Sequence, residues 1–244
     1  MRTIGVIPAR FESSRFPGKP LADILGRPMI WWVYQQCLKV EELDRVIVAT
    51  DDPRIGEACG GYGMDWLMTS KDCATGSDRV AEAAEKIEGD LFVNIQGDEP
   101  VIPPQMIQEV IGIFSDESVC FGTLKTRIQD MEEIQAASTV KVVTDRLGDA
   151  LYFSRSPIPS NIKDGFRAEV FRHVGIYAYR REFLLKFHAM PQTELELGEG
   201  IEPLRAMENG YRVRVAETRH SSIGVDYPEH IARVTQYLAD RGAL

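Results

Sequence analysis

Three short apolar runs, each followed at once by a polar loop, constrain the fold of this 244-residue chain more than any other feature. They span residues 3–7, 45–50 and 90–95. Runs of this length without alternation are typical of parallel strands that are buried on both faces. Segments with helical spacing of apolar residues, such as 29–40 and 77–87, lie between them. We therefore expect βαβ units with right-handed crossovers and a mostly parallel sheet.

Local signals place several helix ends. Pro28 suits the first position of the helix that follows it, and Ser77-Asp78 can cap the next. Pro228 is expected to start the terminal helix, which carries Ile231, Val234 and Leu238 on one face.

The second half of the chain has a different pattern. Residues 140–144 and 150–154 flank a polar turn and predict a β-hairpin, with further strands at 173–179 and 211–217. Residues 192–200 are acidic and carry no assignable pattern. The expected fold class is α/β: a three-layer, mostly parallel sheet with an antiparallel insertion in the second half. Residues 1–244 are expected to form a single domain, in which about 125–210 make a lid or dimerisation subdomain.

Charge and composition argue against several classes of protein. The net charge of -9 argues against nucleic-acid binding, which needs a basic surface. No run approaches the roughly 20 apolar residues of a membrane span, and the first strand begins within three residues of Met1, so we expect no membrane segment and no leader. The cysteines lack metal-ligand spacing, which predicts reduced thiols and a cytoplasmic protein. They are Cys37, Cys59, Cys73 and Cys120.

The loop at 8–20, after the first strand, predicts an anion site. It holds Arg10, Arg15 and Lys19 together with the hydroxyls of Ser13 and Ser14. Ligands of open α/β sheets bind beyond the carboxyl ends of the strands, and three cations there can neutralise a polyphosphate. The alternative is a solvated basic loop.

A second loop, at 96–100, is expected to converge on the first, because parallel strands end at the same sheet edge. It carries Asp98 beside Gln96. Cations that hold phosphate and a carboxylate that holds the metal are what a magnesium–triphosphate needs. The alternative for Asp98 is a turn aspartate. Gly18-Lys19-Pro20 is not a kinase-type phosphate loop, and neither a dinucleotide fingerprint nor a hydrolase motif is present.

Nine blocks in this order resemble the CMP-Kdo synthetases, the 3-deoxy-manno-octulosonate (Kdo) cytidylyltransferases, over nearly the whole chain. The blocks are Ile7-Pro8-Ala9-Arg10, residues 13–20, Ala49-Thr50-Asp51-Asp52, residues 75–79, residues 94–100, Val140-Lys141-Val142-Val143, residues 150–159, residues 173–177 and Gly224-Val225-Asp226.

The resemblance implies a cytidylyltransferase domain that moves CMP from CTP to the anomeric hydroxyl of Kdo, with Mg²⁺ as cofactor and a homodimer as assembly. It implies Lys19, Arg10 and Asp98 as catalytic residues, and Asp98 and Asp226 as magnesium ligands. The implied nucleotide-binding residues are Pro8, Ala9, Arg10, Ser13, Lys19, Thr75, Gly76, Ser77 and Arg79. The implied acceptor-binding residues are Arg15, Gln96, Arg155, His173, Tyr177 and Glu202. Without the resemblance, Asp226 is equally a helix cap, and Tyr177 can be a core aromatic.

Two departures from the family pattern fall on the acceptor side. Pro203 stands where the family has glutamine, and Ser160 where it has tryptophan. The acceptor can therefore be Kdo, a modified Kdo or another acidic alcohol. A third hypothesis is a nucleotide-binding regulator without catalysis, which the presence of Lys19, Asp98 and Asp226 disfavours.

Overall fold

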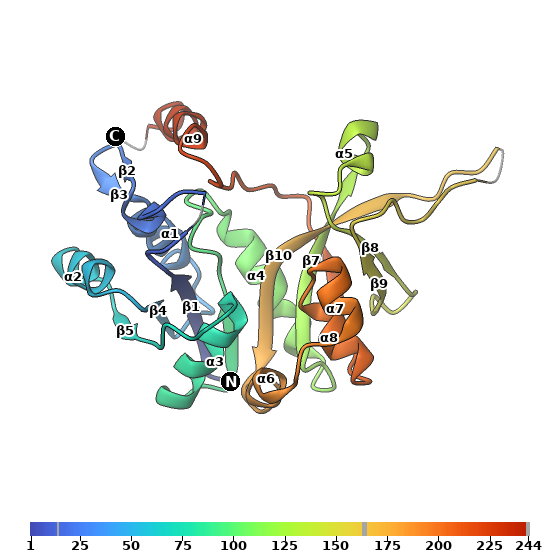
Figure 1. The fold of residues 1–244 in the computed structure, drawn as a ribbon, viewed down its shortest axis with the longest axis horizontal. Helices are drawn as coiled ribbons and strands as arrows, with labels where there is room; N and C mark the ends of the chain where they lie inside the picture. Colours follow the sequence, from blue (N-terminus) through green and yellow to red (C-terminus); the bar gives the residue numbers. More distant parts are fainter. Residues whose placement is uncertain (14, 163–164, 243–244) are drawn as a thin grey trace. The chain divides into compact units, whose positions relative to one another are not determined.

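A computed structural model describes residues 1–13, 15–162 and 165–242, so Ser14 of the predicted anion site lies outside the described residues. The chain divides into two compact units, drawn in Figure 1. The first comprises residues 1–108 and 221–244, and the second comprises residues 109–220. Each unit is described by itself. The second unit is wider than the expected 125–210 subdomain, whose role as a lid or dimerisation region stays a prediction.

The first unit contains a four-stranded parallel sheet in the order β6-β1-β4-β5. Its central strand β1 (Thr3–Ala9) is buried along almost its whole length. Ile4 of β1 lies opposite Arg45 of one neighbour and Phe92 of the other. The three buried strands expected from the sequence, β1 and two of the others, were predicted within one or two residues at each end. The strands of this sheet besides β1 are β4 (Arg45–Thr50), β5 (Trp66–Met68) and β6 (Leu91–Asn94).

The order of the strands reverses beside β1. The chain moves from β1 to β4 and β5 through α1 (Met29–Cys37) and α2 (Pro53–Gly61), then returns through α3 (Gly76–Lys86) to β6. Right-handed crossovers put α1 and α2 on one face of the sheet and α3 on the other, and α1 and α3 both pack on β1. Such a reversal opens a crevice at the carboxyl ends of the two strands, here β1 and β6.

Three helix ends differ from the prediction. Pro28 is the extended N-cap of α1 and not its first residue, because it pairs in a small hairpin of β2 (Asp23–Ile24) and β3 (Arg27–Pro28). Thr75, not Ser77-Asp78, caps α3: its Oγ1 accepts from the N–H of Asp78, whose carboxylate accepts from the N–H of Thr75. This capping box makes Asp78 the third helical residue.

The terminal helix α9 (His230–Ala239) begins two residues after Pro228, with Glu229 as its N-cap. Its predicted apolar face is confirmed. Val234 and Leu238 pack in a cluster with Ile24, Met29 and Trp32, and Ile231 lies against the same cluster.

The second unit is built mainly from antiparallel strands, as the second half of the sequence predicted. β10 (Val170–Arg180) pairs antiparallel with β7 (Phe121–Ile128) and with β8 (Lys141–Thr144). The predicted hairpin is present as β8 and β9 (Ala150–Ser154), and β11 (Arg214–Glu217) joins β7 in parallel. The molecule is therefore of the mixed α/β class, with a parallel sheet and added antiparallel strands.

The remaining helices are short. Three of them are α4 (Pro104–Gly112), α6 (Arg181–Ala189) and α8 (Pro203–Glu208). Two were not predicted, namely α5 (Met131–Gln135) and α7 (Glu194–Glu199). Short 3-10 turns lie at Lys19–Leu21 and Ile113–Ser115.

Candidate active site

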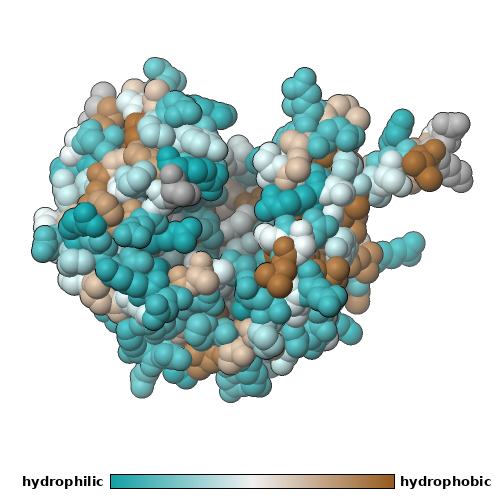
Figure 2. Space-filling view, in the orientation of Figure 1, coloured by the Kyte–Doolittle hydropathy of each residue, from teal (hydrophilic) through white to brown (hydrophobic). Residues whose placement is uncertain are grey.

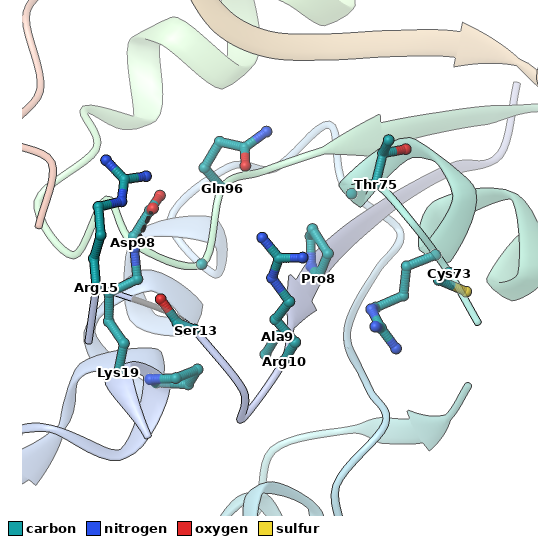
Figure 3. A pocket seen from close by; sticks show the side chains of 14 residues that line it. Pro8, Ala9, Arg10, Ser13, Arg15, Lys19, Cys73, Thr75, Gln96 and Asp98 are labelled. Atoms are coloured by element: carbon teal, nitrogen blue, oxygen red, sulfur yellow. Dashed lines mark hydrogen bonds and ion pairs between the residues drawn. The ribbon is translucent and has the colours of Figure 1, made fainter. Parts of the chain in front are cut away.

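A pocket of the first unit lies at the carboxyl ends of β1 and β6, where the sheet reverses (Figure 3). It brings together most of the predicted nucleotide and metal residues, and three residues that were not predicted, Pro20, Cys73 and Gly97. The predicted residues that line it are Pro8, Ala9, Arg10, Ser13, Arg15, Lys19, Thr75, Gly76, Arg79, Gln96 and Asp98. The two loops after the strands therefore converge, as expected.

The basic loop holds its shape through its own backbone. Gly18 adopts φ +70°, the left-handed region that glycine enters without strain, and its N–H donates to the Phe11 carbonyl at 2.8 Å. This bond joins the first part of the loop, at Phe11, to its last part, at Gly18. Lys19 then begins a 3-10 turn, which directs it back toward the pocket that it lines.

Ion pairs join the basic loop to the two predicted metal carboxylates. The Lys19 Nζ donates to Asp98 Oδ2 at 2.6 Å and to the Val225 carbonyl at 2.9 Å. The Val225 N–H in turn donates to the Asp98 carbonyl at 2.9 Å. The next residue, Asp226, pairs with Arg15 at 3.2 Å. Asp98 and Asp226 are 128 positions apart in the sequence but come from adjoining backbone segments.

The pocket has two ends. Figure 3 shows Arg15, Lys19 and Asp98 grouped at one end and Thr75 and Cys73 at the other, with Arg10 between them. Among the described residues, no group of three or more His, Cys, Asp or Glu side chains is arranged to hold a metal ion.

Gly97 lets the two strand ends approach closely. A Cβ at this position would lie 2.7 Å from the Pro8 carbonyl oxygen, a contact that backbone atoms cannot relieve without moving. At Gly76 a Cβ would lie 3.5 Å from both Pro8 Cγ and Asn94 Nδ2, which is ordinary contact. Only Gly97 is therefore required by close packing here.

Arg79 lines the pocket, but its guanidinium is used to hold loops. It is 3% exposed, pairs with Asp51 at 2.8 Å, and donates to the Thr69 hydroxyl and the Ser70 carbonyl. Ser77, predicted beside it, is buried and is not among the residues that line the pocket.

Cys73 is a pocket residue that the motif analysis missed. Its thiol donates to Glu82 Oε2 at 3.3 Å, and the same carboxylate accepts from the Ser70 N–H at 2.7 Å. Burial, and then the Glu82 carboxylate, raises the pKa of the Cys73 thiol to about 11. The thiol is therefore protonated near neutral pH. All four cysteines are free, as predicted.

The remaining predicted acceptor residues belong to the second unit. Arg155 donates from its Nε to the Glu199 carbonyl at 2.6 Å and from its Nη1 to the Ala137 carbonyl at 2.9 Å, and these bonds fix the guanidinium while leaving other N–H groups of its five for a ligand. Glu202 immediately precedes α8.

His173 and Tyr177 lie together on β10, with ring centroids 5.4 Å apart. The His173 Nε2 lies 3.0 Å from the Thr123 hydroxyl, which can also donate to the carbonyl of Val174 or of Ile176. The ring tautomer decides whether Nε2 donates to this hydroxyl or accepts from it. Burial lowers the pKa of His173 to about 3, and burial and Glu202 raise the pKa of Tyr177. Both side chains are neutral over the physiological range.

Comparison with known proteins places the chain in a family. The cytidylyltransferase family model matches residues 4–218. A 3-deoxy-manno-octulosonate cytidylyltransferase from Geobacter metallireducens is 48% identical over 98% of this chain and 98% of its own length. Another from Geobacter sulfurreducens is 49% identical over 98% and 100%. The chain belongs to the 3-deoxy-manno-octulosonate cytidylyltransferase family.

Solved structures agree with this family. A CMP:2-keto-3-deoxy-manno-octonic acid synthetase complexed with CTP matches with a TM-score of 0.94 and 42% identity, over 99% of this chain and 100% of the other. A cytidylyltransferase from Leptospira borgpetersenii, 13% identical, matches with a TM-score of 0.64, over 98% and 87%, and shares the fold alone. The resemblance found in the sequence motifs is thus confirmed, and the protein is a nucleotidyltransferase.

The two departures from the family pattern have different settings. Pro203 is buried at the first position of α8, where proline's fixed φ suits a helix start. Ser160 is exposed and lines a groove of the second unit with Met131, Pro159 and Asn161. Pro203 therefore has a structural reason that requires no change of acceptor, whereas the structure gives none for Ser160.

No helix among the described residues is long and apolar enough to cross a bilayer.

Proposed function

We propose that the protein transfers the cytidylyl group of CTP to the anomeric hydroxyl of Kdo and releases pyrophosphate. The observation that supports this most is the pocket at the β1–β6 reversal, which gathers the basic loop, the helix-capping Thr75 and Asp98. Relatives named for this reaction match over nearly their full length.

In this proposal the nucleotide lies along the pocket. Its phosphates are held by Arg10, Lys19 and Ser13, and its base lies near the backbone of Pro8 and Ala9. Arginine and lysine suit phosphate oxygens because they form charge-assisted hydrogen bonds. The N-terminus of α3, at Gly76, adds a backbone N–H and the positive end of a helix dipole. Ser77 and Arg79 support that helix start.

The donor set at Asp98 and Asp226 fits magnesium. This ion takes oxygen ligands and is usually bound through one or two carboxylates together with substrate phosphates. When bound, it would neutralise charge on the phosphates and help the pyrophosphate to leave. Two carboxylates on adjoining segments are therefore enough for a site that the nucleotide completes.

The chain's own residues then contribute position and charge. The acceptor oxygen loses its proton and forms a bond to the α-phosphorus, while the bond from that phosphorus to the pyrophosphate oxygen breaks. Negative charge grows on the pyrophosphate, and the fixed cations Arg10 and Lys19 stabilise it without reorganising. Arg15 and Gln96, in the same pocket, are proposed to face the acceptor. The roles of Arg155, His173, Tyr177 and Glu202 toward the acceptor stay predictions.

The test is pyrophosphate release from CTP and Mg²⁺ with a panel of acceptors. We expect release with Kdo and little release without an acceptor. The alternative, transfer to a modified Kdo or another acidic alcohol, rests on Ser160 and Pro203, and predicts faster release with such a compound than with Kdo. If CTP binds but no member of the panel gives release, the protein is a nucleotide-binding regulator and the proposal fails.

We also propose a homodimer in the cytoplasm, where CTP is available. The second unit carries exposed apolar side chains that a second copy could cover, including Met131, Ile162 and Phe166 at 64%, 88% and 63% exposure. Figure 2 shows hydrophobic surface beside the grey atoms of the residues left undescribed. Sedimentation of the purified protein tests the assembly.

A further inference from the structure

Most cations of the pocket are already paired with carboxylates that line it or lie next to it. It contains four cations, and three of them are already paired: Lys19 with Asp98, Arg15 with Asp226 and Arg79 with Asp51. Among the described residues, Arg10 is the pocket cation for which the structure gives no ion pair or hydrogen bond.

The Lys19 pair is the better sheltered of the two that involve predicted metal ligands. The Lys19 side chain is 15% exposed and that of Asp98 is 35% exposed, whereas Arg15 and Asp226 are 56% and 49% exposed. Water screens the second pair more strongly, so it opposes a competing cation less. Lys19 is also fixed by its bond to the Val225 carbonyl.

We propose that Lys19 and Arg15 are resident counter-ions of Asp98 and Asp226, so that a divalent cation enters the site together with nucleotide phosphates rather than before them. A cation that arrives alone competes with the Lys19 ammonium, which lies 2.6 Å from Asp98 Oδ2, and an ammonium displaced in this way is left without an anion, which is costly in a partly buried site. A nucleotide supplies phosphate oxygens that receive the displaced ammonium, and a carboxylate then becomes free for the metal.

This inference rests on the proposed use of Asp98 and Asp226 as metal ligands. It adds that Asp98 and Asp226 become available to the metal only when Lys19 and Arg15 exchange these carboxylates for nucleotide phosphates. The binding of nucleotide and of metal should then favour one another, and the coupling must be reciprocal.

The experiment uses Mn²⁺ as a spin probe on the nucleotide-free protein, with the free ion followed by electron paramagnetic resonance. We expect weak binding to the wild type and at least about tenfold tighter binding to Lys19→Met, because the competing charge near Asp98 is gone. Arg15→Met, at an exposed position, should give a smaller gain and covers the case in which Lys19→Met does not fold. The double variant Lys19→Met, Asp98→Asn should return to the weak binding of the wild type.

Arg10→Met is the matched control, because it removes one positive charge from the same pocket without freeing a carboxylate. Its Mn²⁺ affinity should equal that of the wild type. An equal gain in Arg10→Met and Lys19→Met would indicate a general charge effect and overturn the inference, as would tight Mn²⁺ binding to the wild type. Pyrophosphate release is measured separately, so a failure of the proposed function leaves this nucleotide-free result interpretable.

Discussion

Gly97 shows how one atom can decide the geometry of the pocket. The β1 and β6 ends must approach for the two loops to meet, and a Cβ at Gly97 would lie 2.7 Å from the Pro8 carbonyl oxygen. In Gly97→Ala one of the two strand ends has to move, and small displacements of binding groups can cost large factors in rate. We expect kcat/KM for CTP to fall at least roughly tenfold.

Gly61→Ala provides the control for this glycine. Gly61 ends α2, and a Cβ there would meet nothing within 4 Å. That variant should keep the kcat/KM of the wild type. Wild-type activity in Gly97→Ala would show that the strand ends tolerate separation, and that the close approach has no role in the reaction.

For single residues, the sequence predicts which side chains line the pocket better than it predicts what those side chains are bonded to. Arg79 and Ser77 were both expected at the nucleotide, but Arg79 is bound to Asp51 and Ser77 is buried outside the pocket lining. Cys73 was missed because a lone cysteine carries no motif. Its relation to Glu82, nine residues later, depends on the fold of the loop and leaves no periodic signal.

Among the elements, the basic loop is anchored to α2 by a stack of side chains. The Arg54 guanidinium lies 3.3 Å from the Phe11 ring centroid and pairs with Asp52, the N-cap of α2. The Phe11 ring in turn packs against Gly18. In Arg54→Ala the basic loop loses the contact between the Arg54 guanidinium and the Phe11 ring, which holds the loop in its binding conformation. We therefore expect KM for CTP to rise roughly fivefold with little change in kcat.

Arg241→Ala is the matched control for the stack, since Arg241 lies 3.7 Å from the Tyr237 ring centroid at the end of the chain, after α9. Its KM should be unchanged. If Arg54→Ala lowers the melting temperature but leaves KM at the wild-type value, the stack stabilises α2 and does not position the loop.

Helices and strands could be told apart from the sequence where the segments were long. The buried strands of the first unit carry continuous apolar runs, and α9 shows its apolar face directly. The helices α5 and α7 have five and six residues, too few for a helical period to emerge. One signal for α7 was available: Glu196 follows Thr193 by three residues, the spacing of a capping box, and its carboxylate accepts from the Thr193 N–H at 3.3 Å.

For the whole molecule, the division into two units was only partly predictable. The boundary between residues 108 and 109 falls within α4, so no loop, proline cluster or change of composition marks it. The antiparallel character of the second unit was visible in its hairpin. Its extent was not, because residues 109–124 continue the apolar pattern of the first half.

The pH dependence of stability should be traceable to one histidine of the second unit. The pKa of His173 is lowered by burial to about 3, against about 6.5 in an unfolded chain. Between these values the unfolded state binds a proton that the folded state does not, so stability is complete above about pH 6.5 and falls as the pH decreases. At pH 5 the loss of unfolding free energy is at most about 2 kcal/mol.

In His173→Gln, whose amide can still donate to Thr123, urea midpoints at pH 5 and pH 7.5 should differ less than in the wild type. His220→Gln is the control, since His220 is 41% exposed and near Glu109 in the same unit. An equal loss of pH dependence in both variants would assign the effect to exposed charge rather than to the partly buried His173 ring.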